Sequence, residues 1–297
     1  MDLDLRRRFF AEELEAVCKL RSPHLVNAFA TVPRERYLGP GPWTVLAETP
    51  YMPGLGSGPG AGLPLQVTPD ADPGRTYHNI AVAIDPARQL FNGQPGTLAV
   101  WLDALNLLPG SHVLHVGSGL GYYTAVIGQA VGSSGRVVAF EVDEALAAAA
   151  KRNLAPMPWV DVRHGDSSQL NGETFNAIMI NAGATHPLDP WLNALAPRGR
   201  MILPLTSTMP GMAPTLGKGL VFLVTRQDDV SFDANVLSVV AVYSAVGIRD
   251  DRLNSALGKA LIAGPAQWQA VKRLRRDAHE ASAGCWFHAS TCCLSSV

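Results

Sequence analysis

The chain is poor in charge and has no long apolar run, and both shortages exclude classes of partner. Charged residues make up 16% of its 297 residues and the formal net charge is −1. No strong electrostatic field would therefore draw the protein to nucleic acid or to an anionic membrane. No apolar run approaches the roughly 18 residues of a membrane-spanning helix. We expect neither a nucleic-acid partner nor a membrane partner.

Cysteine is also scarce, and it is unevenly placed. The four cysteines are Cys18 and, near the C-terminus, Cys285, Cys292 and Cys293. They make no disulfide framework for a chain of this size, and the Asp- and Arg-rich start has no apolar signal segment, so we expect the cytoplasm. With His288 the late cysteines form C-x2-H-x3-C-C, a thiolate and imidazole set that suits zinc. Because this spacing fits no standard zinc finger, we predict no metal.

The most informative stretch runs over residues 113–125. Residues 112–116 have the length and composition of a buried strand, and residues 122–131 carry apolar side chains on one helical stripe. Between them lie Gly117, Gly119 and Gly121. A strand, a glycine turn and a helix in this order allow a backbone to approach a nucleotide closely, because a Cβ would obstruct the turn or the ligand.

The spacing of these glycines and a later carboxylate predict the kind of ligand. The pattern G-x-G-x-G is one residue shorter than the dinucleotide fingerprint G-x-G-x-x-G. The acidic residue expected about 20 positions further on is Glu141, which ends a strand predicted over 136–140. A carboxylate there accepts from both hydroxyls of a ribose. The sequence therefore predicts an adenosine-containing ligand, with a purely structural turn as the alternative.

Residues 116–125, Val-Gly-Ser-Gly-Leu-Gly-Tyr-Tyr-Thr-Ala, resemble the S-adenosylmethionine loop of protein-L-isoaspartate O-methyltransferases. Tyr122 and Thr124 make the match more specific than a generic methyltransferase loop. The resemblance covers roughly residues 5–245 in the family's order. It implies an α/β fold, a Rossmann-like and mostly parallel sheet with helices on both faces. It also implies S-adenosyl-L-methionine as the cofactor.

The resemblance further implies a set of cofactor-binding residues. Asp166 follows a strand predicted over 160–163 and would accept from the exocyclic amine of adenine, although a turn role is also open. His115 stands where this class usually carries an acidic residue. Its imidazole can accept a hydrogen bond without supplying charge, and a satisfied histidine at a strand end is an equal alternative. The predicted set is His115, Gly117, Ser118, Gly119, Gly121, Tyr122, Thr124, Glu141, Val142, Asp166, Ser167 and Asn181.

The acceptor side departs from the resembled family. The family carries a serine close to the acceptor carboxylate, followed by glutamine or alanine and then proline. Aligning Gln94 and Pro95 with that segment puts Gly93 at the serine position. Asn92 and Gln94 are then the candidate catalytic groups. Their alternative role is to cap the helix predicted over 97–107.

The implied activity is methyl transfer from S-adenosylmethionine to a carboxylate, with an isoaspartyl side chain in a peptide as the acceptor. An ionised carboxylate is already a nucleophile, so catalysis needs positioning and the exclusion of water more than a base. A dedicated peptide or small-molecule acceptor, and a cofactor-binding adaptor without catalysis, stay open. The short glycine spacing disfavours a nicotinamide oxidoreductase. The oligomeric state is left open.

The chain divides into three predicted parts. The first is an N-terminal helical segment (1–78) that includes an irregular Gly/Pro-rich loop (39–74), either a lid over the site or a surface loop. The second is the Rossmann-like cofactor-binding domain (79–245), and the third is a C-terminal helical extension (246–297). The predicted helices of the outer parts are 2–20, 22–29, 252–262 and 265–280, and a closing antiparallel pair is predicted at 219–225 and 236–243.

Overall fold

A computed structural model describes residues 2–46, 65–208, 215–289 and 291–297. The helices among these residues are α1 (Leu3–Cys18), α2 (Pro23–Thr31), α3 (Pro95–Ala104), α4 (Tyr122–Val131), α5 (Glu144–Leu154), α6 (Asp189–Ala194), α7 (Asp251–Ile262) and α8 (Pro265–Gln269). The strands are β1 (Thr44–Leu46), β2 (Leu65–Val67), β3 (Ala81–Asp85), β4 (Leu90–Phe91), β5 (His112–Val116), β6 (Arg136–Glu141), β7 (Val160–His164), β8 (Phe175–Ile180), β9 (Leu195–Ser207), β10 (Leu216–Arg226), β11 (Ser231–Tyr243), β12 (Arg273–Arg275), β13 (Cys285–His288) and β14 (Cys293–Ser295).

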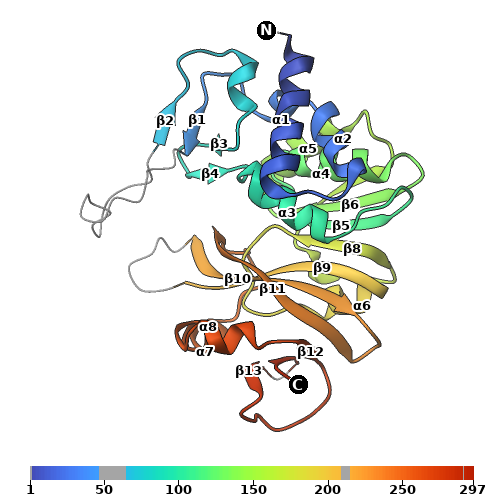
Figure 1. The fold of residues 1–297 in the computed structure, drawn as a ribbon, viewed down its shortest axis with the longest axis vertical. Coiled ribbons are helices and arrows are strands. Elements are labelled where there is room, and N and C mark those ends of the chain that lie inside the picture. Colours follow the sequence, from blue (N-terminus) through green and yellow to red (C-terminus); the bar gives the residue numbers. More distant parts are fainter. Residues whose placement is uncertain (1, 47–64, 209–214, 290) are drawn as a thin grey trace.

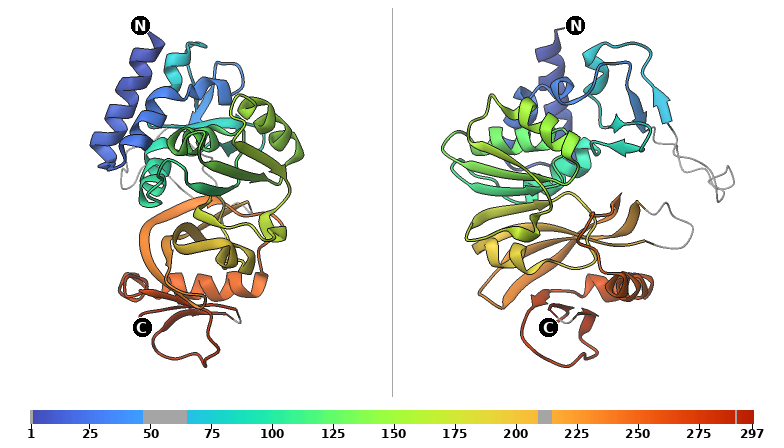
Figure 2. Two further views of the ribbon diagram at one scale, coloured as in Figure 1. Left: turned by 90° about the vertical axis from the view of Figure 1, so that its right-hand side faces the viewer. Right: turned by 180° about the vertical axis from the view of Figure 1, so that it is seen from behind.

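A ten-stranded sheet runs through the molecule in the order β13-β14-β12-β11-β10-β9-β8-β5-β6-β7. Strands β5 to β8 pair in parallel, as does β9 with β8, whereas β9 to β14 pair antiparallel. The predicted antiparallel pair is confirmed as β10 and β11. The N-terminal helices and the C-terminal strands lie at opposite ends of the long axis in Figure 1 and in both views of Figure 2.

Alternate residues of the parallel strands face two separate apolar cores. In β5, Val113 joins the cluster that includes α1 to α4, and Leu114 joins the cluster that includes Trp191 of α6 and Leu257 of α7. This period of two is what a sheet covered on both faces requires. The predicted Rossmann-like sheet with helices on both faces is confirmed.

The N-terminal helices are confirmed, but α1 turns a different face to the core. The spacing that predicts this helix is that of Leu5, Phe9, Leu14, Val17 and Cys18. Leu14 is buried as such a stripe requires, but Leu5, Phe9 and Val17 are exposed and Phe10 is buried in their place. The prediction missed this face because it also carries the buried Arg7, which donates to Tyr77 at 2.9 Å. The apolar stripe alone did not show which side is buried.

Two further predictions are wrong in part. The 39–74 segment is not wholly irregular: its described residues hold β1 and β2, which extend a four-stranded sheet β2-β1-β3-β4, and residues 47–64 lie outside the described part. The helix predicted over 265–280 ends at Gln269, and β12 pairs with the edge of β11 instead. Leu274 is buried between two outward-facing arginines, which is the alternation of a strand and not of a helix.

Candidate active site

The glycine turn has the geometry that its sequence predicts. Gly117, Gly119 and Gly121 have φ angles of +84°, +55° and +96°, a region that side chains with a Cβ rarely adopt. A Cβ on Gly121 would lie 2.8 Å from Leu154 Cδ1, whereas one on Gly119 would meet only Ile84 at 3.4 Å. Gly121 therefore serves packing, and Gly119 leaves the turn open toward the space above it.

That space is a cavity of about 530 Å³ at the carboxyl ends of β5, β6 and β8. Strand β5 lies at the point where the strand order reverses, between β6 on one side and β8 on the other. Ligands of open α/β sheets bind at such a point, outside the carboxyl ends of the strands. Of the predicted residues, the cavity is lined by Asn92, Gly117, Ser118, Gly119, Tyr122, Glu141, Val142 and Asn181.

Glu141 holds the acidic position of the cavity. Its side chain is buried, and its two carboxylate oxygens accept from the backbone N–H of Gly119 at 2.7 Å and of Asp143 at 3.1 Å. Burial raises the pKa of Glu141, and these backbone hydrogen bonds oppose that rise. The carboxylate thus fixes the glycine turn, and it keeps lone pairs for hydroxyls of a ligand.

Buried polar atoms without partners gather around this cavity. In the part of the chain that the structure describes, six buried side-chain nitrogen or oxygen atoms have no hydrogen-bond partner. Four of them belong to residues that line the cavity, namely Asn92 Nδ2, Ser118 Oγ, Tyr122 Oη and Ser244 Oγ. Buried polar groups are normally paired. The concentration of the exceptions in one place indicates that a polar ligand belongs there.

The two candidate catalytic residues are placed differently. Asn92 lines the cavity, with its Oδ1 accepting from Val82 N at 3.0 Å and from Arg34 Nη2 at 3.2 Å. Gln94 is not among the lining residues, and its Nε2 donates to the Asn79 carbonyl at 3.3 Å. Gln94 occupies the cap position of α3 without a side-chain cap bond. The geometry therefore favours Asn92 over Gln94 as a group that meets the acceptor.

Arg34 fixes the wall that carries Asn92. Its side chain is fully buried, and its guanidinium donates to the carbonyls of Thr76, His78 and Ile80 at 2.6–3.1 Å. It also lies over the ring of Tyr122, 5.6 Å from the ring centre. Arg34 is therefore a buried structural charge and not a solvated one. No local pattern in the sequence predicts this burial, because the three carbonyls lie more than 40 residues away.

His115 and Thr124 lie beneath the turn and not along the cavity. Both are fully buried, and His115 Nδ1 lies 2.9 Å from Thr124 Oγ1. Burial lowers the pKa of His115 to about 4, so its imidazole is neutral at neutral pH. Its other ring nitrogen, Nε2, is buried without a hydrogen-bond partner among the described residues, so His115 is not the fully satisfied strand-end histidine of the alternative. Thr124 contacts His115 and does not line the cavity itself.

Of the predicted cofactor-binding residues Asp166, Ser167 and Asn181, only Asn181 lines the cavity. Asp166 does not line the cavity, and its Oδ1 accepts from Ser168 N at 2.8 Å, as a turn residue would. Ser167 is buried and accepts from Trp191 Nε1 at 2.7 Å. Asn181 does line the cavity, and its Nδ2 donates to the Gly117 carbonyl at 3.4 Å.

Several lining residues carry no signal in the sequence. Ser244 follows β11, a long antiparallel strand, and reaches the cavity because Gly183, just after β8, pairs with it in a bridge. Arg88, in the turn between β3 and β4, lies at the cavity and pairs with Asp143 at 2.7 Å. Both positions depend on contacts between distant segments. Tyr37, Phe91 and Tyr243 add aromatic surface.

Comparisons with known proteins agree with this geometry. The family model described as protein-L-isoaspartate(D-aspartate) O-methyltransferase matches residues 68–232. A protein-L-isoaspartate O-methyltransferase of Methylorubrum extorquens is 32% identical over 187 residues, covering 61% of this chain and 77% of that protein. One from Archaeoglobus fulgidus is 30% identical over 215 residues, covering 70% and 83%. Another from the same organism matches over only 52% of its own length.

Solved structures show the same fold. A protein-L-isoaspartate O-methyltransferase superposes with a TM-score of 0.61 at 22% identity, over 84% of this chain and 69% of the other. A Plasmodium falciparum protein, described as a putative member solved with S-adenosyl-L-homocysteine, gives 0.56 at 18% identity, over 80% and 97%. At these identities the likeness shows that the fold is shared.

The family model and the sequence relatives show the family. The chain belongs to the protein-L-isoaspartate(D-aspartate) O-methyltransferase family. The resemblance drawn from the glycine turn is therefore confirmed. No helix among the described residues is long and apolar enough to cross a membrane.

Proposed function

We propose that this protein transfers a methyl group from S-adenosylmethionine to the carboxylate of an isoaspartyl residue in a peptide or protein. The observation that carries the proposal is the cavity at the glycine turn, where Glu141 and four unpaired buried polar atoms converge. These groups fit a nucleoside with an amino-acid tail better than an apolar ligand, because each needs a polar partner. The family supplies the acceptor class.

The residues around the cavity fit the parts of this cofactor. Glu141 can accept from the ribose hydroxyls, and the exposed Val142 beside it can cover one face of the adenine. Asn181 and Ser118 offer polar groups where the amino-acid tail would lie. When bound, S-adenosylmethionine supplies an electrophilic methyl group on a sulfonium. The open side of Gly119 is where the backbone can approach it.

On the acceptor side the chain positions a carboxylate and needs no base. Asn92 Nδ2, Tyr122 Oη and Ser244 Oγ are donors without partners that can hold carboxylate oxygens. Burial raises the pKa of Tyr122 above its ordinary value, so its hydroxyl keeps the proton that it donates. Positioning of this kind contributes most of what such a transfer requires.

The acceptor segment explains why the family serine is missing. Gly93 has φ +83°, and its carbonyl accepts from Tyr123 Oη at 3.1 Å. A serine in that conformation would be strained, costing about 1–2 kcal/mol. The unpaired Asn92 Nδ2 lies one residue away and supplies a donor in this part of the site. We therefore expect the proposed activity not to need a hydroxyl at position 93.

The test is methyl transfer from radiolabelled S-adenosylmethionine to an isoaspartyl peptide, with the aspartyl twin of the same peptide as control. We expect base-labile label on the isoaspartyl peptide alone. Ser118→Ala should weaken cofactor binding about tenfold, the equivalent of one hydrogen bond. The exposed Ser133→Ala, in the turn after α4, should change nothing. Cofactor binding without label on either peptide would reject the isoaspartyl acceptor and favour a dedicated acceptor or an adaptor.

A further inference from the structure

Two cysteines and two histidines converge in the C-terminal extension, far from the cavity along the chain. The ligand atoms of His279, Cys285, His288 and Cys293 all lie within 4.8 Å of one another. We propose that this thiol–imidazole cluster is a structural zinc site that fastens the end of the chain. The proposal stands apart from the methyltransferase function, because none of the four residues lines the cavity.

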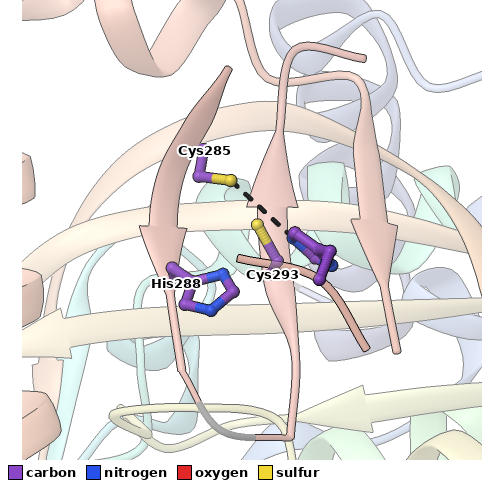
Figure 3. Close-up of side chains that lie close together, drawn as sticks. Cys285, His288 and Cys293 are labelled. Carbon is purple, nitrogen blue, oxygen red and sulfur yellow. Dashed lines mark hydrogen bonds between the residues drawn. The ribbon is translucent and has the colours of Figure 1, made fainter. Parts of the chain in front are cut away.

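A β-bulge brings three of the ligands to one face. Cys285 and His288 are three positions apart, so a regular strand would point them to opposite faces. In the β13–β14 pairing, however, Cys285 lies opposite Ser295 and His288 opposite Cys293, with a register shift between Cys285 and Phe287. The extra residue restores the phase. Figure 3 shows Cys285, His288 and Cys293 on this hairpin, with their side chains turned toward one another.

The opposite face of the hairpin belongs to the core. Phe287 and Leu294 are buried in the apolar cluster beneath the sheet, and Cys292 is buried there too. Adjacent residues of a strand alternate between faces, which separates Cys292 from Cys293. The sequence pattern C-x2-H-x3-C-C includes Cys292 as a possible ligand. In the structure Cys292 lies on the other face, and His279 is the fourth residue of the cluster.

The fourth ligand comes from the loop between β12 and β13 and is already oriented. His279 Nε2 lies 3.7 Å from Cys285 Sγ, within hydrogen-bond distance for sulfur. Its other ring nitrogen, Nδ1, lies 2.9 Å from the Asp277 carbonyl oxygen. The Asp277 carboxylate in turn accepts from Nε and Nη2 of Arg275, at 2.9 and 2.6 Å. A carbonyl or carboxylate behind the distal nitrogen is the usual support of a zinc-binding histidine.

The donor set identifies the ion and its role. Two thiolates and two imidazoles suit zinc, which prefers four such ligands in a tetrahedron when its role is structural. Ligand atoms about 2.0–2.3 Å from such an ion stand about 3.3–3.8 Å apart, so the cluster needs to close by about 1 Å. The backbone N–H of Ser282 donates to Cys285 Sγ at 3.4 Å and supports charge on that sulfur.

The extension has a need for such an ion. Its three strands hold three, four and three residues, and they reach the main sheet only through β12. The loop that carries His279 has no helix or strand between β12 and β13. Small units of this size rarely bury enough apolar surface to hold by themselves, and a metal then supplies the stability.

The test is metal analysis of the full-length protein, purified under reducing conditions with zinc supplied and no chelator. We expect one zinc per chain by plasma mass spectrometry. Cys285→Ser and His279→Ala should lose it, while Cys292→Ala and Cys18→Ala, which remove cysteines outside the cluster, should keep it. Retention of zinc by both cluster variants would overturn the site.

Cobalt substitution of the unaltered protein covers the case in which the variants do not fold. We expect thiolate-to-cobalt charge-transfer bands and the visible bands of a tetrahedral ion, with cobalt displaced by zinc. A chelator should then speed amide exchange over residues 277–295 and leave α4 unchanged. Absence of both zinc and the thiolate–cobalt bands in the reduced protein would overturn the proposal. So would a Cys285–Cys293 disulfide that reforms in the presence of zinc.

Discussion

The cavity at the glycine turn and the thiol–imidazole cluster lie on the same ten-stranded sheet, but they are built in different ways. The cavity is shaped mainly by backbone: three glycines with positive φ angles and a carboxylate that accepts from the turn itself. The cluster consists of four side chains from a loop and two short strands, in phase only because of a bulge. Sites of the first kind are encoded by consecutive residues, whereas the second kind depends on pairing register.

The two sites are also separate in what supports them. The cavity wall rests on Arg34 and on the core of α1 to α4, and the cluster rests on Arg275 and Asp277 beside β12. A change at one should therefore leave the other intact. Each of the following predictions alters the cavity side, and none should change the cluster.

The largest effect is expected from Arg34→Ala. It removes the buried guanidinium that donates to the carbonyls of Thr76, His78 and Ile80, and to Asn92 Oδ1. We expect the free energy of unfolding to fall by at least about 3 kcal/mol in urea titrations, and cofactor affinity to fall with it. Arg36→Ala, an exposed neighbour, should cost less than about 0.5 kcal/mol. A loss below 1 kcal/mol for Arg34→Ala would show that the wall stands without it.

Acid should destabilise the cavity side through His115. In the unfolded chain this imidazole has its ordinary pKa, near 6.5, and in the folded protein burial lowers it to about 4. Between these values the unfolded chain binds a proton that the folded protein does not, so stability falls as the pH falls. The loss amounts to about 3 kcal/mol over that range. His115→Asn should flatten this slope, and His112→Asn, exposed at the start of the same strand, should not.

Glu141→Gln should act on binding more than on folding. The amide keeps one acceptor oxygen but loses the charge that ribose hydroxyls meet, and hydrogen bonds to charged groups contribute about 1.5–3 kcal/mol. We expect S-adenosylmethionine to bind about 10- to 100-fold more weakly by calorimetry. Glu144→Gln, exposed in the first turn of α5, is the matched control. Equal affinities for the two variants would remove Glu141 from the cofactor site.

Gly93→Ser should have the smallest effect. The positive φ angle at this position should cost the variant about 1–2 kcal/mol of stability. Leu98 Cδ2, 2.9 Å from an added Cβ, is the end of a flexible side chain and can move. Transfer to an isoaspartyl peptide should not rise. A serine variant that is equally stable and transfers methyl groups faster than the unaltered protein would show that the site lacks a hydroxyl that it needs.

The elements that form the cavity at the glycine turn can be predicted well from the sequence. Periodicity and the glycine spacing predict β5, α4 and β6 to within a residue, and Glu141, at the predicted distance, lines the cavity with the glycine turn. The order of strand, turn and helix is local, so neighbouring residues decide it. Family resemblance then supplies the cofactor and the acceptor class.

The features that could not be predicted from the sequence depend on contacts between distant segments. Arg34 is buried because three carbonyls more than 40 residues away surround it, and Ser244 reaches the cavity through a bridge to Gly183. Residues 273–275 form a strand because they pair with the free edge of β11. The cluster needed the bulge in β13, which no spacing rule reveals.

Titration of the unaltered protein and of Glu141→Gln with S-adenosylmethionine and with NAD is the measurement that tests the central claim most directly. The account predicts that S-adenosylmethionine binds and raises the melting temperature of the unaltered protein, that NAD does neither, and that the variant binds S-adenosylmethionine 10- to 100-fold more weakly, a range of about 1.5–3 kcal/mol. Binding of NAD in preference, or no binding of S-adenosylmethionine at all, would contradict the assignment of the cavity to methyl transfer.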